Sequence, residues 1–455
     1  MYASAATSVT SSTTTSASAA TSTAASTAAP TTESKATSAS APGPDRQGFW
    51  SNRFIRSILL SAVFLQLGIW VRNFAILLFV TEQTDKDPVA LSFISVAEFA
   101  PIFVFSFIGG AFADRWRPKR TMVLCDVLSA ASVFAVLLTL VYGGWQAIFF
   151  ATLVSSILSQ FSQPAGMKLF KLHVPEEQIP MGMSMYQTIQ AVFMILGPML
   201  GTLVYFRLGI QAAVVLMGVC FLLSAAVLTT LPRDQVIRKT GPSARIGEDI
   251  RSGLRYVKGN KIFVYMGSFF LAAGLALGLI NPLGVYVVTE HLKRAEDSLQ
   301  WLTAANGAGM ILGGMLVMGL SKRVSPRVML LIGFVGNAAA VAVVGSTGSM
   351  GVALAAQFVS GLMVPFIHIS CQTLVMSHAE EAFVGRVSGI LNPLFTGGMV
   401  LTMSLSGVLK TNLPLAALFG AAAVLFLLGA VGVLPLLRHK EPARTAPAAA
   451  GLRHH

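Results

Sequence analysis

The chain has 455 residues, of which 54% are apolar and only 11% are Asp, Glu, Lys or Arg. A soluble domain carries about 25% of these charged residues, and the apolar residues here fall in runs long enough to cross a bilayer, so a soluble enzyme, a disordered chain and a disulfide scaffold are excluded. The net charge is +13, but the basic residues are distributed by topology rather than gathered in one patch, so we expect no nucleic-acid partner.

The first 48 residues form a segment of different composition. Of residues 1–44, 35 are Ala, Ser or Thr, a composition that cannot bury a core and predicts a disordered tail. The segment lacks the basic and apolar regions of a secretory signal peptide, and an organellar transit peptide would be richer in Arg. We interpret 1–48 as a dispensable tail.

From Phe54 onward the sequence predicts an all-α integral membrane protein with twelve transmembrane helices. Short connections make successive helices antiparallel neighbours, and the one long polar connection follows the sixth helix. This predicts two six-helix bundles at 49–231 and 262–437, a cytoplasmic linker at 232–261 and a tail at 438–455. The predicted helices span 54–80, 89–112, 121–142, 145–167, 184–206, 210–231, 262–288, 298–320, 327–347, 350–377, 386–409 and 414–437.

The linker contains a short amphipathic pattern. Ile246, Ile250, Leu254 and Val257 recur at helical spacing, with basic residues between them. This spacing predicts a helix with a basic face that lies on the membrane surface.

The Lys and Arg residues predict the orientation. With the N-terminus in the cytoplasm, the loops and tails on that side hold 26 of the 32, the opposite loops hold five, and Arg72 lies inside a helix. Cytoplasmic loops carry the excess of positive charge. We therefore expect a multi-pass protein of the cell membrane with both termini in the cytoplasm and anionic lipid at its basic side.

The two halves also share a local pattern. The second helix runs through Gly109 and Gly110 into a basic turn, and the eighth runs through Gly313 and Gly314 into another. Two six-helix repeats joined by one long loop are typical of secondary transporters.

The first of these turns resembles the loop 2–3 signature of the major facilitator superfamily, G-x-x-x-D-R-x-G-R-[RK], although its second glycine is missing. The resemblance extends over about residues 50–440, and the phrase 172–178 is similar to the drug and macrolide efflux branch, which includes enterobactin-exporter-like proteins. It implies a transporter of a bacterial inner membrane rather than an enzyme. The residues that fit the signature are Gly110, Asp114, Arg115, Arg117, Lys119 and Arg120.

The signature has a physical interpretation. The glycines let the second and eleventh helices approach, and Asp114 accepts hydrogen bonds from a helix N-terminus, forming a latch that stabilises the outward-facing state. The alternative is a static loop that is basic only because it is cytoplasmic. Met318 replaces the Asp in the second half, so we expect a single working latch.

Gly197, Pro198 and Gly201 in the fifth helix are similar to the core of the antiporter motif of exporters, with Thr202 in place of the last glycine. The proline bends the helix and the glycines permit close packing. An ordinary kinked transmembrane helix explains the same residues, so the motif favours export without deciding it.

Two charges lie inside the predicted membrane helices. Arg72 and Glu98 lie on adjacent antiparallel helices at depths that differ by about 4 Å, so they can form a pair. In one interpretation Glu98 is the proton site, and the proton and substrate compete for its carboxylate. In the other, the two residues form a permanent structural ion pair.

The other candidates are weaker. Asp126, one turn into the third helix, is expected to pair with the basic loop before it, and His368 is a further candidate for proton coupling. His368 and Cys371 alone do not make a metal site, so we expect no metal. The predicted polar lining of the cavity is Gln66, Asn73, Gln163, Gln187, Gln190, Asn281 and Asn392.

These features predict a secondary active transporter that exports lipophilic small molecules in exchange for protons by alternating access. One carboxylate in a largely apolar cavity suits such a substrate better than a sugar. The alternative is a dedicated exporter of one natural product, such as a siderophore or a peptide antibiotic. No Walker motif or hydrolase signature occurs, so we expect no enzyme activity, no cofactor beyond the proton gradient and a functional monomer.

Overall fold

The computed structural model describes residues 52–115, 117–141, 146–174, 178–231, 246–321, 323–380 and 383–438, without the side chains of 106–115, 141, 163, 164, 167, 170–173, 179, 180, 246–250, 384 and 438. These residues form helices and contain no strand. The predicted N-terminal tail at 1–48, the first half of the linker at 232–245 and the C-terminal residues 439–455 lie outside the described residues.

The N-terminal half contains five continuous helical segments. At Gly209 the backbone adopts φ 78° and ψ 175°, a conformation that is open essentially to glycine alone. The last segment therefore consists of two helices that meet at Gly209. The segments are α1 (Arg53–Gln83), α2 (Pro88–Arg115), α3 (Pro118–Val141), α4 (Ala147–His173) and α5 (Ile179–Thr229).

The C-terminal half begins with the linker helix and includes one interrupted transmembrane helix. Pro282 follows α7, and the chain continues there as short 3₁₀, α and π segments, because proline removes a backbone donor. The elements are α6 (Ile246–Gly259), α7 (Lys261–Ile280), η3 (Asn281–Leu283), α8 (Gly284–Tyr286), η4 (Val287–His291), η5 (Glu296–Ser298), α9 (Leu299–Leu320), α10 (Pro326–Ser346), α11 (Met350–His378), α12 (Val384–Asn412) and α13 (Leu415–Arg438).

The described residues contain the twelve predicted membrane helices. Ten helical stretches are long and apolar enough to cross a membrane, and one of them, Met181–Thr229, holds both helices that meet at Gly209. The shorter apolar stretch Ala147–Ser162 in α4 supplies the twelfth. The predicted count and fold class are therefore confirmed.

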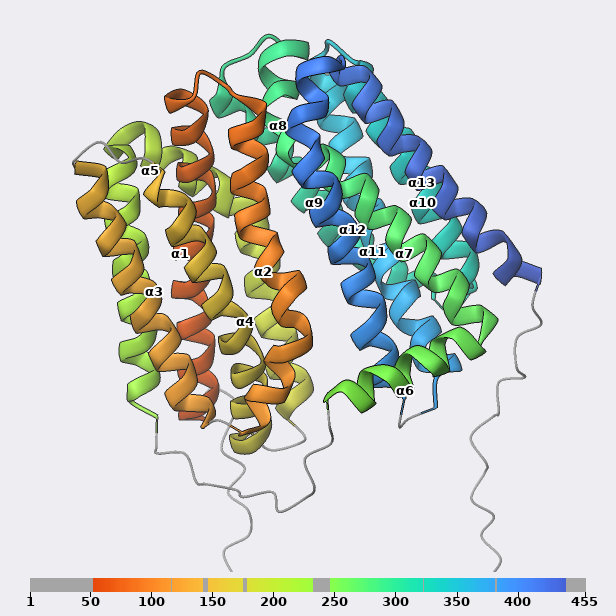
Figure 1. Ribbon diagram of the computed structural model, residues 1–455, viewed down its shortest axis with the longest axis horizontal. Coiled ribbons are helices and arrows are strands. Elements are labelled where there is room, and N and C mark those ends of the chain that lie inside the picture. The colour runs from red at the N-terminus through yellow and green to blue at the C-terminus, as the bar shows by residue number, and fades with distance from the viewer. Residues whose placement is uncertain are drawn as a thin grey trace, which may run out of the picture. The chain divides into compact units, whose positions relative to one another are not determined.

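The two halves repeat the same packing (Figure 1). In the first half α1 packs on α5, α2 on α4, and α3 on both α4 and α5. In the second half α7 packs on α12 and α13, α9 on α11, and α10 on both α11 and α13. The membrane helices α7, α9, α10 and α11 thus take the places of α1, α2, α3 and α4, and α12 and α13 take those of the two helices of α5. This is the arrangement of two six-helix repeats.

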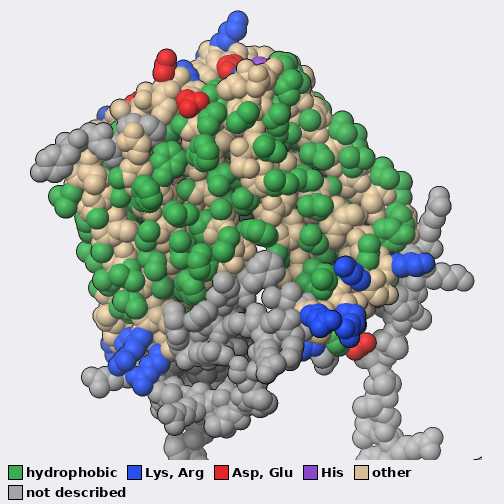
Figure 2. Space-filling model, viewed as in Figure 1, with side chains coloured by type: hydrophobic (Ala, Val, Ile, Leu, Met, Phe, Trp, Pro, Cys, Tyr) green, Lys and Arg blue, Asp and Glu red, His purple; other side chains and the backbone are tan. Residues whose placement is uncertain are grey.

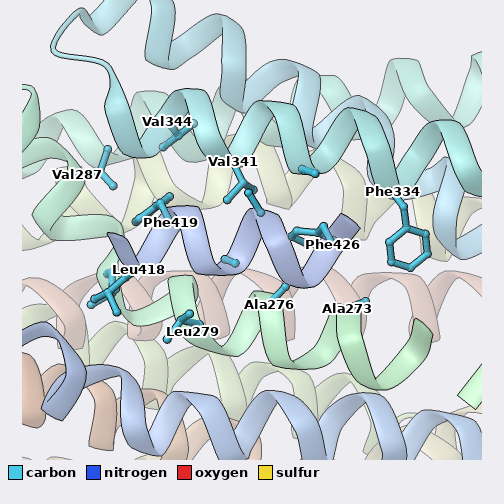
Figure 3. Packing of buried hydrophobic residues seen from close by; sticks show 14 of the residues in the cluster. Ala273, Ala276, Leu279, Val287, Phe334, Val341, Val344, Leu418, Phe419 and Phe426 are labelled. Carbon is cyan, nitrogen blue, oxygen red and sulfur yellow. The ribbon is translucent and has the colours of Figure 1, made fainter. Parts of the chain in front are cut away.

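The largest apolar core lies mainly in the second half. Figure 3 shows Phe419 and Phe426 of α13 between α10, which carries Val341, and α7, which carries Ala276. Small residues on α7 let large side chains fill the space between the helices, as close packing requires.

The predicted amphipathic helix is present as α6, which lies across the lower end of α7 and α12 in Figure 1. Tyr256 stacks on Phe383 with ring centroids 4.2 Å apart. Arg251 and Arg255 are exposed on α6. The aromatic contact fixes the apolar face of α6 on the bundle and leaves these arginines outside.

The two ends of the molecule differ in charge. Figure 2 shows clusters of Lys and Arg side chains along the lower rim, below a broad belt of hydrophobic side chains, and side chains of both charges, with Asp and Glu among them, at the upper rim. We call the lower end, where α1 and α3 begin, the basic side. The opposite side contains the connection from α1 to α2 and the segments η4 and η5.

Candidate functional site

A cavity of about 670 Å³ lies inside the N-terminal half. It extends along α1 from Ile58 to Arg72, a length of about 21 Å at 1.5 Å per residue. Its described lining comes from α1 to α5 alone: Ile58, Ser61, Ala62, Leu65, Gln66, Ile69, Arg72, Glu98, Ile102, Met122, Cys125, Asp126, Ser129, Ser155, Ser156, Leu158, Ser159, Gln160, Ser162, Gly166, Met183, Tyr186, Gln187, Gln190 and Phe221.

Arg72 and Glu98 meet at the end of this cavity. Arg72 Nη2 lies 4.0 Å from Glu98 Oε1. Arg72 also donates from Nε to Asn73 Oδ1 at 2.9 Å and from Nη1 to Ser155 Oγ at 2.8 Å. Asn73 Nδ2 in turn donates to Glu98 Oε1 at 2.7 Å. Asn73 thus connects the two charged groups.

The two charges differ in their exposure. The Arg72 side chain is 6% exposed, whereas that of Glu98 is 27% exposed and borders the cavity. A buried guanidinium needs hydrogen-bond partners, and Arg72 has them in Asn73 and Ser155. Among the described residues, Glu98 has one short hydrogen bond to Asn73 and a long contact to Arg72. The arrangement fixes Arg72 and leaves the carboxylate accessible to a proton or a cation.

Asp126 lines the same cavity closer to the basic side. Its Oδ2 accepts a hydrogen bond of 2.6 Å from Ser224, whose hydroxyl also lies 2.8 Å from that of Ser61. We predicted an ion pair with the preceding basic loop. Among the described residues Asp126 accepts instead from the hydroxyl of Ser224, because its side chain points into the bundle, where the residue is 3% exposed.

The serines of the cavity were not predicted from the sequence. Ser155, Ser159 and Ser162 recur at helical spacing along α4 and all line the cavity. A polar stripe at i, i+4 and i+7 in an apolar helix is the signal that marks this face. It makes the lining more polar than the single carboxylate suggests.

The other predicted lining residues lie in different places. Gln66, Gln187 and Gln190 line the cavity, whereas Asn73 lies behind the charged pair. Asn281 and Asn392 are exposed in the C-terminal half and are not among the residues that line this cavity, so their predicted role stays a prediction. The side chain of Gln163 lies outside the described residues.

His368 is exposed on α11 and does not border this cavity, while Cys371, one turn away, is buried. Among the described residues no three His, Cys, Asp or Glu side chains converge on a point that could hold a metal. The predicted role of His368 in proton coupling stays a prediction.

The loop between α2 and α3 is described in part. The side chains of Gly110, Asp114 and Arg115 lie outside the described residues, so the predicted latch stays a prediction. Arg117 and Arg120 are exposed. Lys119 Nζ donates to the carbonyl of Thr229 at 2.8 Å and to that of Leu231, which neutralises the negative end of the α5 dipole.

The antiporter-like glycines form the contact between α5 and α1. A Cβ atom on Gly197 would overlap the side chain of Trp70, and one on Gly201 would come within 2.7 Å of Phe74 Cβ. The glycines therefore allow α5 to pack closely on the helix that carries Arg72. Pro198 lies within α5 between them.

The two halves are joined on the side opposite the basic side. Lys86 Nζ lies 3.2 Å from Glu296 Oε1, and Tyr286 donates to the Lys86 carbonyl at 2.6 Å. Asp85 and Lys86 both have positive φ, 49° and 62°, which costs energy for residues other than glycine. We call Lys86, Tyr286 and Glu296 the outer closure.

Small residues extend this contact toward the membrane centre. A Cβ on Gly407 of α12 would overlap the backbone of Pro88 at the start of α2, and one on Gly397 would come within 2.8 Å of the Phe103 ring. Helices approach this closely only where a side chain is absent. The α2–α12 seam therefore closes the interface on the side of the outer closure.

Comparison with known proteins agrees with this architecture. The model of the Major Facilitator Superfamily matches residues 58–293 and, a second time, 266–454. The chain belongs to the Major Facilitator Superfamily. The two matches together cover residues 58–454, and the protein is therefore a multi-pass membrane transporter and not an enzyme.

Relatives in this superfamily include characterised efflux pumps. The chain is 26% identical to the uncharacterized MFS-type transporter YkuC of Bacillus subtilis, over 79% of this chain and 86% of that protein. It is 28% identical to the multidrug efflux pump Tap of Mycolicibacterium fortuitum (79% and 90% covered) and 22% identical to macrolide efflux protein A of Streptococcus pyogenes (79% and 87% covered). The drug and macrolide efflux resemblance is thereby confirmed.

Solved structures show the same fold. The crystal structure of the nucleoside transporter NupG matches with a TM-score of 0.68 over 86% of this chain and 100% of that one, at 15% identity. At this identity the match supports the fold and carries no information on the substrate.

Proposed function

We propose that this protein exports lipophilic small molecules of the drug or macrolide type in exchange for protons, by alternating access. The observation that carries the proposal is Glu98, a partly exposed carboxylate at the end of a cavity of about 670 Å³. An ionisable residue inside a membrane helix that borders a cavity marks an ion or substrate pathway. The efflux activity of Tap and macrolide efflux protein A supports the direction of transport.

The hydrogen bonds around Glu98 suggest how coupling works. The carboxylate accepts from Asn73 and faces Arg72 at 4.0 Å, so the site is neutral when Glu98 is ionised and positive when it is protonated. A cationic substrate binds the ionised form, and a proton arriving at Glu98 repels it. Asn73 and Ser155 hold Arg72 in place throughout, so the positive charge stays fixed while the proton moves.

We further propose that the basic side faces the cytoplasm. Cytoplasmic loops of membrane proteins carry the excess of Lys and Arg, and the outer closure then lies on the extracellular side. The contacts of Lys86 with Tyr286 and Glu296 support our assignment of this conformation to the inward-facing member of the transport cycle. Separation of these residues opens the other side.

The experiment uses everted membrane vesicles energised to an acid interior. Lipophilic cations and macrolides are added one at a time, and proton release is recorded for the wild type, Glu98→Gln and Asp126→Asn. We expect release by the wild type that vanishes in Glu98→Gln and persists in Asp126→Asn. The Asp126 variant is the matched control, because Asp126 is a second carboxylate of the same cavity.

Other outcomes distinguish the alternatives. Release that survives Glu98→Gln and vanishes in Asp126→Asn transfers the coupling role to Asp126. No release with any compound favours the dedicated exporter of one natural product. The serines and glutamines of the lining favour this second candidate, since they offer hydrogen bonds that a purely lipophilic substrate does not use.

A further inference from the structure

A second hollow of about 510 Å³ lies on the surface of the N-terminal half, where α3 and α4 pack together. Leu124 and Leu128 on its α3 side are 58% and 44% exposed and do not border the transport cavity. In a membrane-spanning chain, an exposed leucine outside the cavity faces lipid. We call this hollow the α3–α4 groove; its lining is Arg117, Arg120, Thr121, Leu124, Cys125, Leu128, Leu158 and Phe161.

The α3–α4 groove is charged at one end and apolar along the rest. Arg117 and Arg120 are exposed and lie at the start of α3, on the basic side. Beyond Thr121 the lining consists of leucines, Cys125 and Phe161. A ligand that fits this groove has an anionic head and an apolar tail.

The length of the groove matches one leaflet of a bilayer. From Arg117 to Leu128 is eleven residues, about 16 Å along a helix. The hydrocarbon core of a bilayer is about 30 Å thick, so half of it is about 15 Å. An acyl chain that starts at the arginines therefore ends near Leu128.

We propose that the α3–α4 groove binds an anionic phospholipid of the leaflet on the basic side. The phosphate and the charged headgroup accept hydrogen bonds from Arg117 and Arg120, and one acyl chain lies against Leu124, Leu128 and Phe161. Arginine suits this role because its planar group binds phosphate through two parallel hydrogen bonds. The leaflet is the cytoplasmic one if the proposed orientation holds; the binding itself does not depend on the substrate or on proton coupling.

The bound chain touches the wall of the transport cavity. Cys125 and Leu158 line both the α3–α4 groove and the cavity that contains Glu98. One layer of side chains therefore separates the lipid from the transported molecule. We infer that the acyl chain supports this wall from outside.

The test measures lipid binding directly. The purified full-length protein in detergent is titrated with dioleoylphosphatidylglycerol or dioleoylphosphatidylcholine, and bound lipids are counted by native mass spectrometry. We expect one phosphatidylglycerol to bind more tightly than the others, and more tightly than phosphatidylcholine. Each arginine near a lipid surface contributes about a fivefold gain in affinity, so Arg117→Gln/Arg120→Gln is expected to weaken this lipid about 30-fold.

The matched control is Arg251→Gln/Arg255→Gln, which removes two exposed arginines of α6 without touching the groove. It is expected to leave the tight lipid in place. Leu128→Trp fills the apolar part of the groove and keeps both arginines. This variant should weaken binding of the tight lipid. Excess inorganic phosphate should not displace the lipid, because phosphate lacks the chain.

Equal loss in the two arginine pairs would show that the lipid responds to net charge alone and would overturn the proposal. Unchanged binding in Leu128→Trp or displacement by phosphate would remove the acyl chain from the site and contradict it as well. Because no transport is measured, failure of the proposed export function leaves this result unaffected.

Discussion

The N-terminal and C-terminal halves have the same helix packing but different interiors. The first contains a cavity of about 670 Å³ with Arg72, Glu98 and Asp126 on its walls. The second contains most of the largest apolar core, and its helices meet backbone to backbone at several glycines. The first half thus carries the charged lining of the described cavity, while the second contributes most of the apolar core.

This difference shows how two halves with the same fold can take different roles, one lining the cavity and the other forming most of the apolar core. Buried charges cost stability unless they have partners, and a cavity removes contacts that a packed core makes. The C-terminal half contains a buried arginine as well, Arg327 in the first turn of α10, but this residue does not line the described cavity. We expect substitutions in the first half to affect transport most and substitutions at the glycines of the second half to affect folding alone.

The largest effect is expected for Arg72→Met. This variant leaves the ionised Glu98 without its cation, and removal of one partner of a buried pair costs about 3 kcal/mol of the free energy of unfolding. The measurement is thermal unfolding followed with a thiol-reactive dye, since Cys220 and Cys371 are buried and lie outside both described hollows, so that unfolding exposes them.

The double variant Arg72→Met/Glu98→Gln separates stability from transport. With both charges removed, most of the lost stability should return, whereas substrate-dependent proton release should stay absent. A double variant that unfolds like the wild type and also transports like it would show that the pair is only structural.

A smaller effect is expected at the glycines of the C-terminal half. A Cβ on Gly313 of α9 would overlap the backbone of Leu362 on α11, whereas nothing lies within 4 Å of one on Gly314. Gly313→Ala is expected to cost about 1–3 kcal/mol, as overpacking does. Gly314→Ala, the control on the same helix, should be neutral or slightly stabilising, because alanine favours helix.

The thiol-reactive dye assay also measures the stability of Gly313→Ala and Gly314→Ala. Variants of equal stability would contradict close α9–α11 packing. A loss of transport in folded Gly313→Ala that exceeds its loss of stability would show that the C-terminal half is more than a scaffold.

The smallest effect is expected at the outer closure, where the two halves meet. Lys86→Met removes the contact with Glu296, a partly exposed ion pair worth about 0.2–1 kcal/mol. The population of molecules that are closed on this side should fall by up to about fivefold relative to the population that is open there. Distances between spin labels at Gln83→Cys and Ser349→Cys, both exposed, report the change.

Glu290→Gln is the matched control for the outer closure. It breaks the ion pair with Lys410 at 2.9 Å, in which both residues belong to the C-terminal half. The label distances should not change in this variant. An equal shift in both variants would assign the effect to surface charge and not to contact between the halves.

The sequence determined the membrane architecture by itself. The bilayer fixes the length of each apolar helix, and each helix satisfies its own backbone hydrogen bonds, so segment length and hydropathy predict twelve helices without knowledge of their neighbours. The depths of Arg72 and Glu98 likewise followed from helical rise along α1 and α2. The amphipathic helix α6 was predicted because apolar residues recur at helical spacing, with basic residues between them, in a polar connection.

Only the tertiary structure decided which side chains share the cavity. A transmembrane helix is apolar on nearly all sides, so its sequence carries little periodic signal of the face that turns inward. Helix rotation and packing decide that the serines of α4 face the cavity and that Asn73 lies between Arg72 and Glu98. They also decide that Asn281 and Asn392 lie outside the lining of this cavity. The outer closure joins Lys86 to Glu296 across the interface between the halves, and no local pattern encodes a contact between residues so distant in sequence.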